Sequence, residues 1–172
     1  MRLRYRLRQL RDNLTAGPLS AAARREVGEA LSADELALFD RFSPADQWHS
    51  YRVLCDLRRA GYNDPDLATA ALLHDVGKTR YPLSAWDRTV IVVGAVLFPR
   101  RVVAWGQGRV ESWQRPFVVR AHHPQWGAEM AAAVGVGPVA VELIGRHQGK
   151  LAEAPGELTE LLRALQWADD RT

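Results

Sequence analysis

The segment LLHDVGK, residues 72–78, places a histidine and an aspartate side by side at the end of an apolar stretch. Apolar residues at positions 67, 70 and 71 precede His74 at helical spacing, so we expect His74 to face the interior of a helical protein. Consecutive helix residues differ in direction by about 100°, so His74 and Asp75 can approach one common point only near a helix end. Gly77 is typical of such an end, and the pattern predicts a helix over residues 65–76.

The polar residues of this segment are suited to binding metal ions and anions. The two oxygens of Asp75 can each bind a metal ion and so bridge a pair of ions. Lys78, one of two lysines in the chain, can hold an anionic substrate as a point charge. A solvated surface lysine is the alternative interpretation of Lys78.

Three further residues share the apolar faces of predicted helices: His49, His147 and Asp169. A single histidine on an apolar face is more often a hydrogen-bonded core residue than a ligand. A carboxylate is different, because it is almost never buried without a partner or a metal ion. Imidazoles and a carboxylate that converge from separate helices favour a site for a divalent ion.

The hydrophobic pattern is helical almost throughout, without alternating strand runs, and predicts an all-α fold. The stretch 100–120 is irregular and is expected to be a long loop or cover. Residues 1–30 are expected to form a basic amphipathic extension, and residues 31–172 one helical domain, which the capping sequence at Ser32–Glu35 opens. Further helices are expected at about 44–60, 84–98, 124–134, 138–148 and 156–170.

Composition excludes several classes of protein. Among 172 residues, 47% are hydrophobic and 25% charged, which is typical of a globular chain. The single cysteine, Cys55, rules out a disulfide scaffold, an all-thiolate zinc site and an iron–sulfur cluster, and it fits the reducing cytoplasm. The net charge of +3 is too small and scattered to indicate nucleic-acid binding.

Residues 2–14 combine a leucine stripe with five arginines. A helix of this kind can rest on an acidic membrane surface, so weak membrane contact through residues 1–14 is one interpretation. A solvated helix or a frayed terminus is the alternative.

Several segments in order closely resemble the HD superfamily of metal-dependent phosphohydrolases. They are His49, HDVGK at 74–78, HPQWGA at 123–128, IGRH at 144–147 and LQWAD at 165–169, which together span about 45 to 170. The resemblance implies an all-α HD-domain bundle with a metal site between its core helices. It also identifies His123, which precedes Pro124, as the family's histidine, and leaves His122 as an expected loop residue.

The resemblance further implies the metal ligands. His49, His74, Asp75 and Asp169 match the ligands of a first ion, and Asp75 would bridge to a second ion held by His123 and His147. Dinuclear members often carry a histidine pair at the last position, whereas Gln148 follows His147 here. One or two divalent ions are therefore expected, from among Mn, Fe, Co, Mg, Ni and Zn.

The implied activity is hydrolysis of a phosphomonoester or phosphodiester, expected to belong to a nucleotide, by metal-activated water. Asp75 and Lys78 are the expected catalytic residues, and Lys78 and Arg146 the expected contacts to the phosphorylated small molecule. The alternative is a catalytically weak or inactive metal-stabilised module that binds nucleotides or has a regulatory role.

Overall fold

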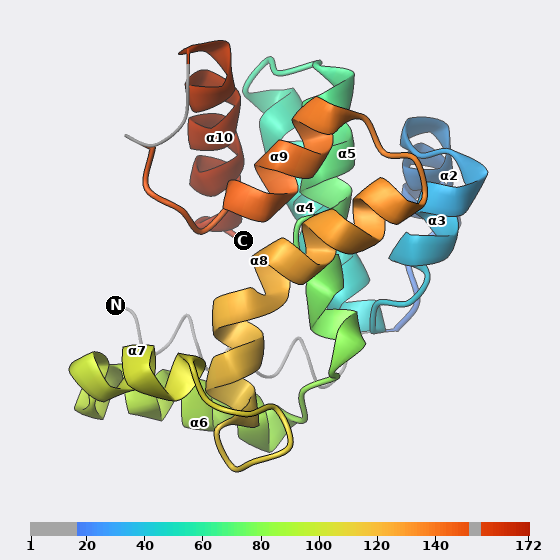
Figure 1. The fold of residues 1–172 in the computed structure, drawn as a ribbon. Coiled ribbons are helices and arrows are strands. Elements are labelled where there is room, and N and C mark those ends of the chain that lie inside the picture. The colour runs from blue at the N-terminus through green and yellow to red at the C-terminus, as the bar shows by residue number, and fades with distance from the viewer. Residues whose placement is uncertain (1–16, 152–155) are drawn as a thin grey trace.

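The computed structural model describes residues 17–151 and 156–172, and within these ranges the chain is helical without strands (Figure 1). The all-α prediction is confirmed. A 3-10 helix, η1 (Val76–Arg80), interrupts the α-helices. The α-helices are α2 (Ala21–Ala30), α3 (Ala33–Phe39), α4 (Pro44–Arg59), α5 (Pro65–Leu73), α6 (Ala85–Leu97), α7 (Pro99–Gly106), α8 (Arg115–Ala133), α9 (Pro138–Arg146) and α10 (Gly156–Asp169).

Local sequence explains where most of these helices begin. The predicted capping box at Ser32 is present, with reciprocal bonds between Ser32 and Glu35. The Asp64 side chain accepts a hydrogen bond from the Leu67 backbone N–H at 2.8 Å, ahead of α5. Prolines occupy the first position of α4, α5 and α9, where the missing N–H leaves no helical bond unmade.

The core lies where α4, α5, α8, α9 and α10 pack together (Figure 1). Leu72, Leu143 and Leu165 are fully buried there, one each from α5, α9 and α10. Val27 of α2 is also fully buried and belongs to the same core, so residues 21–30 pack onto the domain. The predicted helix at 2–14 lies outside the described residues, and the boundary at residue 30 stays a prediction.

The expectation of an irregular stretch at 100–120 was wrong. Residues 99–106 form α7, and α8 begins at Arg115 instead of near residue 124. Pro116 stands in the first turn of α8, whereas Pro124, interpreted as a helix start, lies inside the helix. His122 therefore lies in α8 and not in a loop.

Together α6, α7 and the segment up to residue 114 form what we call the arm, which lies beside the N-terminal half of α8 (Figure 1). Arg88 of α6 ties the arm to α4 through two hydrogen bonds to Asp46, at 3.1 and 3.0 Å. No helix among the described residues is both long and apolar enough to cross a membrane.

Candidate metal centre

Four imidazoles and two carboxylates meet inside the bundle, in two groups of three. The ligand atoms of each group lie within 4.8 Å of one another. The first group unites α4, the end of α5 and α10; the second unites the start of η1, α8 and the end of α9. The first group is His49, His74 and Asp169, and the second is Asp75, His123 and His147.

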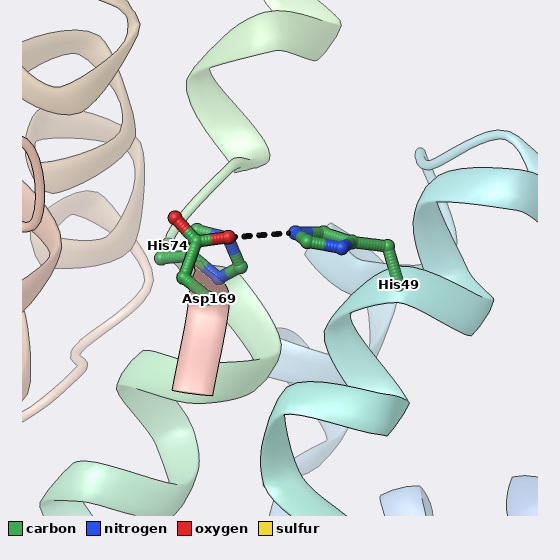
Figure 2. A group of neighbouring side chains, drawn as sticks. All are labelled: His49, His74 and Asp169. Carbon is green, nitrogen blue, oxygen red and sulfur yellow. Dashed lines mark hydrogen bonds and ion pairs between the residues drawn. The ribbon is translucent and has the colours of Figure 1, made fainter. Parts of the chain in front are cut away.

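The first group is partly open to solvent. Figure 2 shows the His49 ring and the Asp169 carboxylate pointing toward each other next to His74. Asp169 Oδ1 lies 3.0 Å from His49 Nε2 and 3.6 Å from His74 Nε2. The two Nε2 atoms are 3.3 Å apart, so two nitrogens and one oxygen face a common point.

The second group is buried. Asp75 Oδ1 lies 3.2 Å from His123 Nε2 and 3.7 Å from His147 Nε2. These two imidazole nitrogens are also 3.3 Å apart. The group therefore repeats the arrangement of two imidazoles and one carboxylate.

Asp75 joins the two groups. Its second oxygen, Oδ2, lies 3.6 Å from His74 Nε2 and 3.9 Å from His49 Nε2. Each oxygen of one carboxylate thus faces a different group of imidazoles. This is the arrangement that a carboxylate bridging two ions requires.

Backbone carbonyls orient three of the four imidazoles. The Nδ1 atoms of His74, His123 and His147 lie 2.8–3.1 Å from carbonyl oxygens of the preceding helical turn. A carbonyl only accepts, so each Nδ1 carries the proton and donates it. In the neutral ring, Nε2 then points its lone pair into the centre, as a metal ligand must.

The sequence makes these carbonyls available. His74 and His147 follow the last residues of α5 and α9, where helix carbonyls have no partner in a next turn. In α8 the same result comes from Pro124, which has no N–H to donate to the Arg120 carbonyl four residues earlier. His123 donates to that carbonyl instead, at 3.0 Å.

Electrostatics favour a cation at the centre. Burial opposes charge on Asp75, yet Lys78 and His74 hold the pKa of that carboxyl well below its usual range. Burial likewise opposes charge on Asp169, but hydrogen bonds from His49 and His74 keep the pKa of Asp169 low. Two ionised carboxylates thus face the centre.

The imidazoles respond to this charge differently. Burial lowers the pKa of His147, and the neighbouring His74 lowers it further, to about 3, so this ring is neutral near pH 7. Burial also acts against charge on His74, but Asp75 and Asp169 outweigh it and raise the pKa of His74 to about 8. The neutral His147 ring presents a lone pair to a metal ion, whereas His74 must lose its proton before its Nε2 can bind one.

This donor set fits divalent metal ions. The Nε2 atoms of His123 and His147 lie 3.3 Å apart while both Nδ1 atoms donate to backbone carbonyls, so one cation between the two Nε2 atoms would satisfy both. Two imidazole nitrogens and one carboxylate in each group form a ligand set that suits Zn, Mn, Fe, Co and Ni. The residues present would hold one ion in each group, with Asp75 shared.

Gly77 keeps α8 close to this centre. The prediction that Gly77 ends a helix over residues 65–76 was wrong, and its φ is not positive, unlike that of Gly61, Gly135 and Gly156. The helix before it ends earlier, at Leu73. A Cβ on Gly77 would lie 2.0 Å from the His123 carbonyl oxygen, so glycine is required by the approach of the two backbones.

A basic cavity of about 510 Å³ adjoins the second group at His123. Lys78 lines this cavity and also contacts Asp75 Oδ2, so its ammonium group stands between cavity and metal centre. Apolar side chains from α6, from α8 and from the segments before α4 and α6 form much of the remaining wall. The charged residues of the lining are Arg41, Asp46, Lys78, Arg88 and Arg120, and its apolar residues include Phe42, Leu83, Ile91 and Val119.

The cavity arginines were not predicted from the sequence, which pointed to Arg146 as the substrate contact instead. Arg146 hydrogen-bonds Glu142 at 2.5 Å and is not among the residues that line the cavity. Arg41 and Arg120 line it, and neither has an ion-pair partner among the described residues. The spacing of Arg120, three residues before His123 on one helix, was a usable signal. Arg41 lies in the turn after α3, and no sequence pattern there indicates that it lines the cavity.

Comparison with known families agrees with this geometry. The family model described as "HD domain" matches residues 48–172. The chain belongs to the HD domain family. HD domains bind divalent metals and are mostly metal-dependent hydrolases, and the matched range contains every residue of both groups. Neither a curated protein nor a solved structure matches the chain.

Proposed function

We propose that this HD protein is a cytoplasmic metal-dependent phosphohydrolase that cleaves a phosphomonoester or phosphodiester bond of a nucleotide. The observation that carries the proposal is the Asp75 carboxylate, whose two oxygens face two separate groups of imidazoles. The basic cavity at His123 gives an anionic substrate direct access to that centre. A volume of about 510 Å³ suits a ligand of nucleotide size.

The metal ligands in this proposal are His49, His74 and Asp169 for one ion and His123 and His147 for the other, with Asp75 between them. A divalent ion held there supplies a water of lowered pKa and offsets charge on the phosphoryl oxygens. Asp75 fixes the spacing of the two groups and accepts hydrogen bonds at the reacting centre.

The basic residues of the cavity hold the substrate in this proposal. Lys78, beside Asp75, binds a non-bridging oxygen of the phosphoryl group that is cleaved. Arg120 and Arg41 take the role expected of Arg146, because their guanidinium groups line the cavity without an ion-pair partner among the described residues. The apolar wall at Phe42 and Ile91 receives the less polar part of the nucleotide.

The test begins with the full chain stripped by a chelator and reloaded separately with Mn²⁺, Fe²⁺, Co²⁺, Ni²⁺, Zn²⁺ or Mg²⁺. Release of phosphate or nucleoside is then measured over a panel of nucleoside mono-, di-, tri- and cyclic phosphates. Turnover with at least one metal supports the proposal. Metal-dependent nucleotide binding without turnover over the whole panel would instead support the non-catalytic module.

Two neighbouring aspartates offer a matched pair of variants. Asp169→Asn removes a carboxylate of the first group, whereas Asp170→Asn changes an exposed neighbour outside both groups. We expect Asp169→Asn to lower kcat/KM by about 1,000-fold, in line with loss of a group that stabilises the transition state, and Asp170→Asn to have no effect. Equal activity of the two variants would contradict the proposed site.

A further inference from the structure

The arm exposes an unusual amount of apolar surface. Of the eleven large hydrophobic side chains exposed in the described part of the chain, eight lie between residues 86 and 113. Monomeric proteins rarely leave such side chains together in water unless they contact a partner or a membrane. The eight are Trp86, Val92, Val93, Val96, Leu97, Phe98, Val103 and Trp113.

Much of this surface is continuous. Positions 92, 93, 96 and 97 follow one another along one side of α6, because residues three and four apart share a helix face. Beside them, Trp86, Val93, Phe98 and Trp113 line a single groove of about 280 Å³. The arm therefore presents an apolar stripe that runs into an aromatic groove.

The charges around the stripe are mainly positive. Arg100 and Arg101 follow directly at the start of α7 and are exposed, and Arg109 is 85% exposed at its side chain. The arm has two carboxylates, and both are engaged: Asp87 with Arg115 at 3.1 Å and Glu111 with Arg109 at 3.8 Å. A partner that covers this face must therefore accept apolar side chains and offer negative charge.

We propose that the arm docks on the surface of an anionic lipid bilayer. Apolar side chains beside arginines are the composition of protein surfaces that rest in the lipid interface, and tryptophans such as Trp86 and Trp113 favour the headgroup level. The cytoplasmic leaflet is anionic, and each arginine near such a surface contributes about 1 kcal/mol. The tips of Val96 and Leu97 enter the acyl boundary, and Arg100 and Arg101 meet the headgroups.

A second copy of the chain is a poorer occupant. In a two-fold symmetric dimer the same patch faces itself, so a face whose unpaired charges, among the described residues, are arginines would meet a second face of the same positive charge. The carboxylates of the arm are already paired and do not offset that repulsion.

The test is flotation of the full chain with vesicles of phosphatidylcholine alone and of phosphatidylcholine with 30% phosphatidylglycerol. We expect binding to the anionic vesicles only. Val96→Gln/Leu97→Gln should weaken binding about 100-fold or more, because two large aliphatic side chains no longer enter the acyl boundary. Arg100→Gln/Arg101→Gln should weaken it about 30-fold, from two losses of about 1 kcal/mol.

Matched controls separate the arm from general charge and from residues 1–14. Val139→Gln removes an exposed valine on α9, and Arg25→Gln/Arg59→Gln removes two charges outside the arm. Both controls should bind like the unchanged chain, and circular dichroism checks that every variant is folded. Residues 1–14 are intact in all variants, so binding that survives both arm variants would assign it to that segment and overturn the proposal.

Two other results would also overturn it. Equal binding to neutral and anionic vesicles would remove the role of the arginines. Absence of flotation, together with a dimer in sedimentation velocity that Val96→Gln/Leu97→Gln dissociates, would assign the face to a second copy.

Discussion

At the metal centre, His74, Asp75 and His123 are at most 4% exposed, whereas in the arm Val96, Val103 and Trp113 are at least 66% exposed. The two regions depart from the usual distribution of side chains in opposite directions. Polar side chains are buried inside the bundle, and large apolar side chains are exposed on the surface of the arm. Burying ionisable groups and exposing large apolar ones both cost free energy unless a ligand or a surface compensates them. The two regions therefore point to two ligands of different chemistry.

This difference has a consequence for mutations. Around the centre, backbones and side chains are in close contact from several helices, so a small change of volume has large effects. In the arm, exposed side chains can change with little effect on folding. Substitutions around the centre should therefore change the free energy of unfolding much more than substitutions in the arm.

Gly77→Ala should cause the largest loss of stability. The new Cβ would lie 2.0 Å from the His123 carbonyl oxygen and 2.6 Å from the Gly127 nitrogen, both backbone atoms that cannot move independently. We expect the free energy of unfolding to fall by about 3 kcal/mol or more in urea denaturation. Metal affinity should fall as well, because η1 and α8 carry ligands of the second group.

Gly28→Ala is the matched control for this variant. A Cβ at Gly28, inside α2, meets nothing within 4 Å, so alanine should stabilise the protein by about 1 kcal/mol. A loss at Gly77 no greater than the change at Gly28 would show that η1 and α8 are not in close contact.

Gly77 also shows what the sequence could and could not predict. Features set by neighbours along the chain were predictable: the cap at Ser32, the start of α5 after Asp64, and the helix faces that turn His49, His147 and Asp169 inward. The structure brings these side chains together, and their binding of metal stays a prediction.

Features set by contacts across the chain were not predictable from the pattern. Gly77 was assigned to a helix end because its true constraint, the backbone of His123, lies 46 residues away in sequence. Pro124 was taken for a helix start because its effect depends on the Arg120 carbonyl and the His123 ring. Arg41 lines the cavity together with residues of η1 and α8, which are far from it in sequence.

Removal of divalent metal should produce the next largest effect. An ion that binds the folded chain alone stabilises it by about 2.7 kcal/mol at a free concentration about 100 times Kd. For a chain of this size the thermal midpoint should fall by about 5–10 °C after treatment with EDTA. The stabilisation should shrink below pH 8, because His74, with a pKa raised to about 8, must lose its proton before it binds the ion.

Asp75→Asn provides the control for metal removal. It keeps the shape of the side chain but removes the charge shared by both groups, so EDTA should no longer change its midpoint. If the wild-type protein showed the same thermal midpoint with EDTA as with Mn²⁺, Zn²⁺, Co²⁺ or Ni²⁺, that result would contradict the metal centre.

Lys78→Met should affect substrate more than folding. It removes the ammonium group between cavity and metal centre, and we expect kcat/KM for a nucleotide substrate to fall about 10- to 100-fold, or about 1.4–2.7 kcal/mol. Lys150, the second lysine of the chain, is exposed and does not line the cavity, so Lys150→Met is the matched control. Steady-state kinetics at saturating metal would separate the two, and equal kcat/KM values would remove Lys78 from the site.

The smallest expected effect on folding belongs to Val96→Gln/Leu97→Gln in the arm. Both side chains are more than 60% exposed, so the free energy of unfolding in urea should change by no more than about 0.5 kcal/mol. Leu165→Ala, at a fully buried position of α10, should by comparison cost about 2–5 kcal/mol. A loss of about 2 kcal/mol or more for the arm variant would mean that another part of the free protein covers the stripe. A change near zero instead means that the stripe contributes little to the fold, so its apolar character has to be explained by what it contacts outside the molecule.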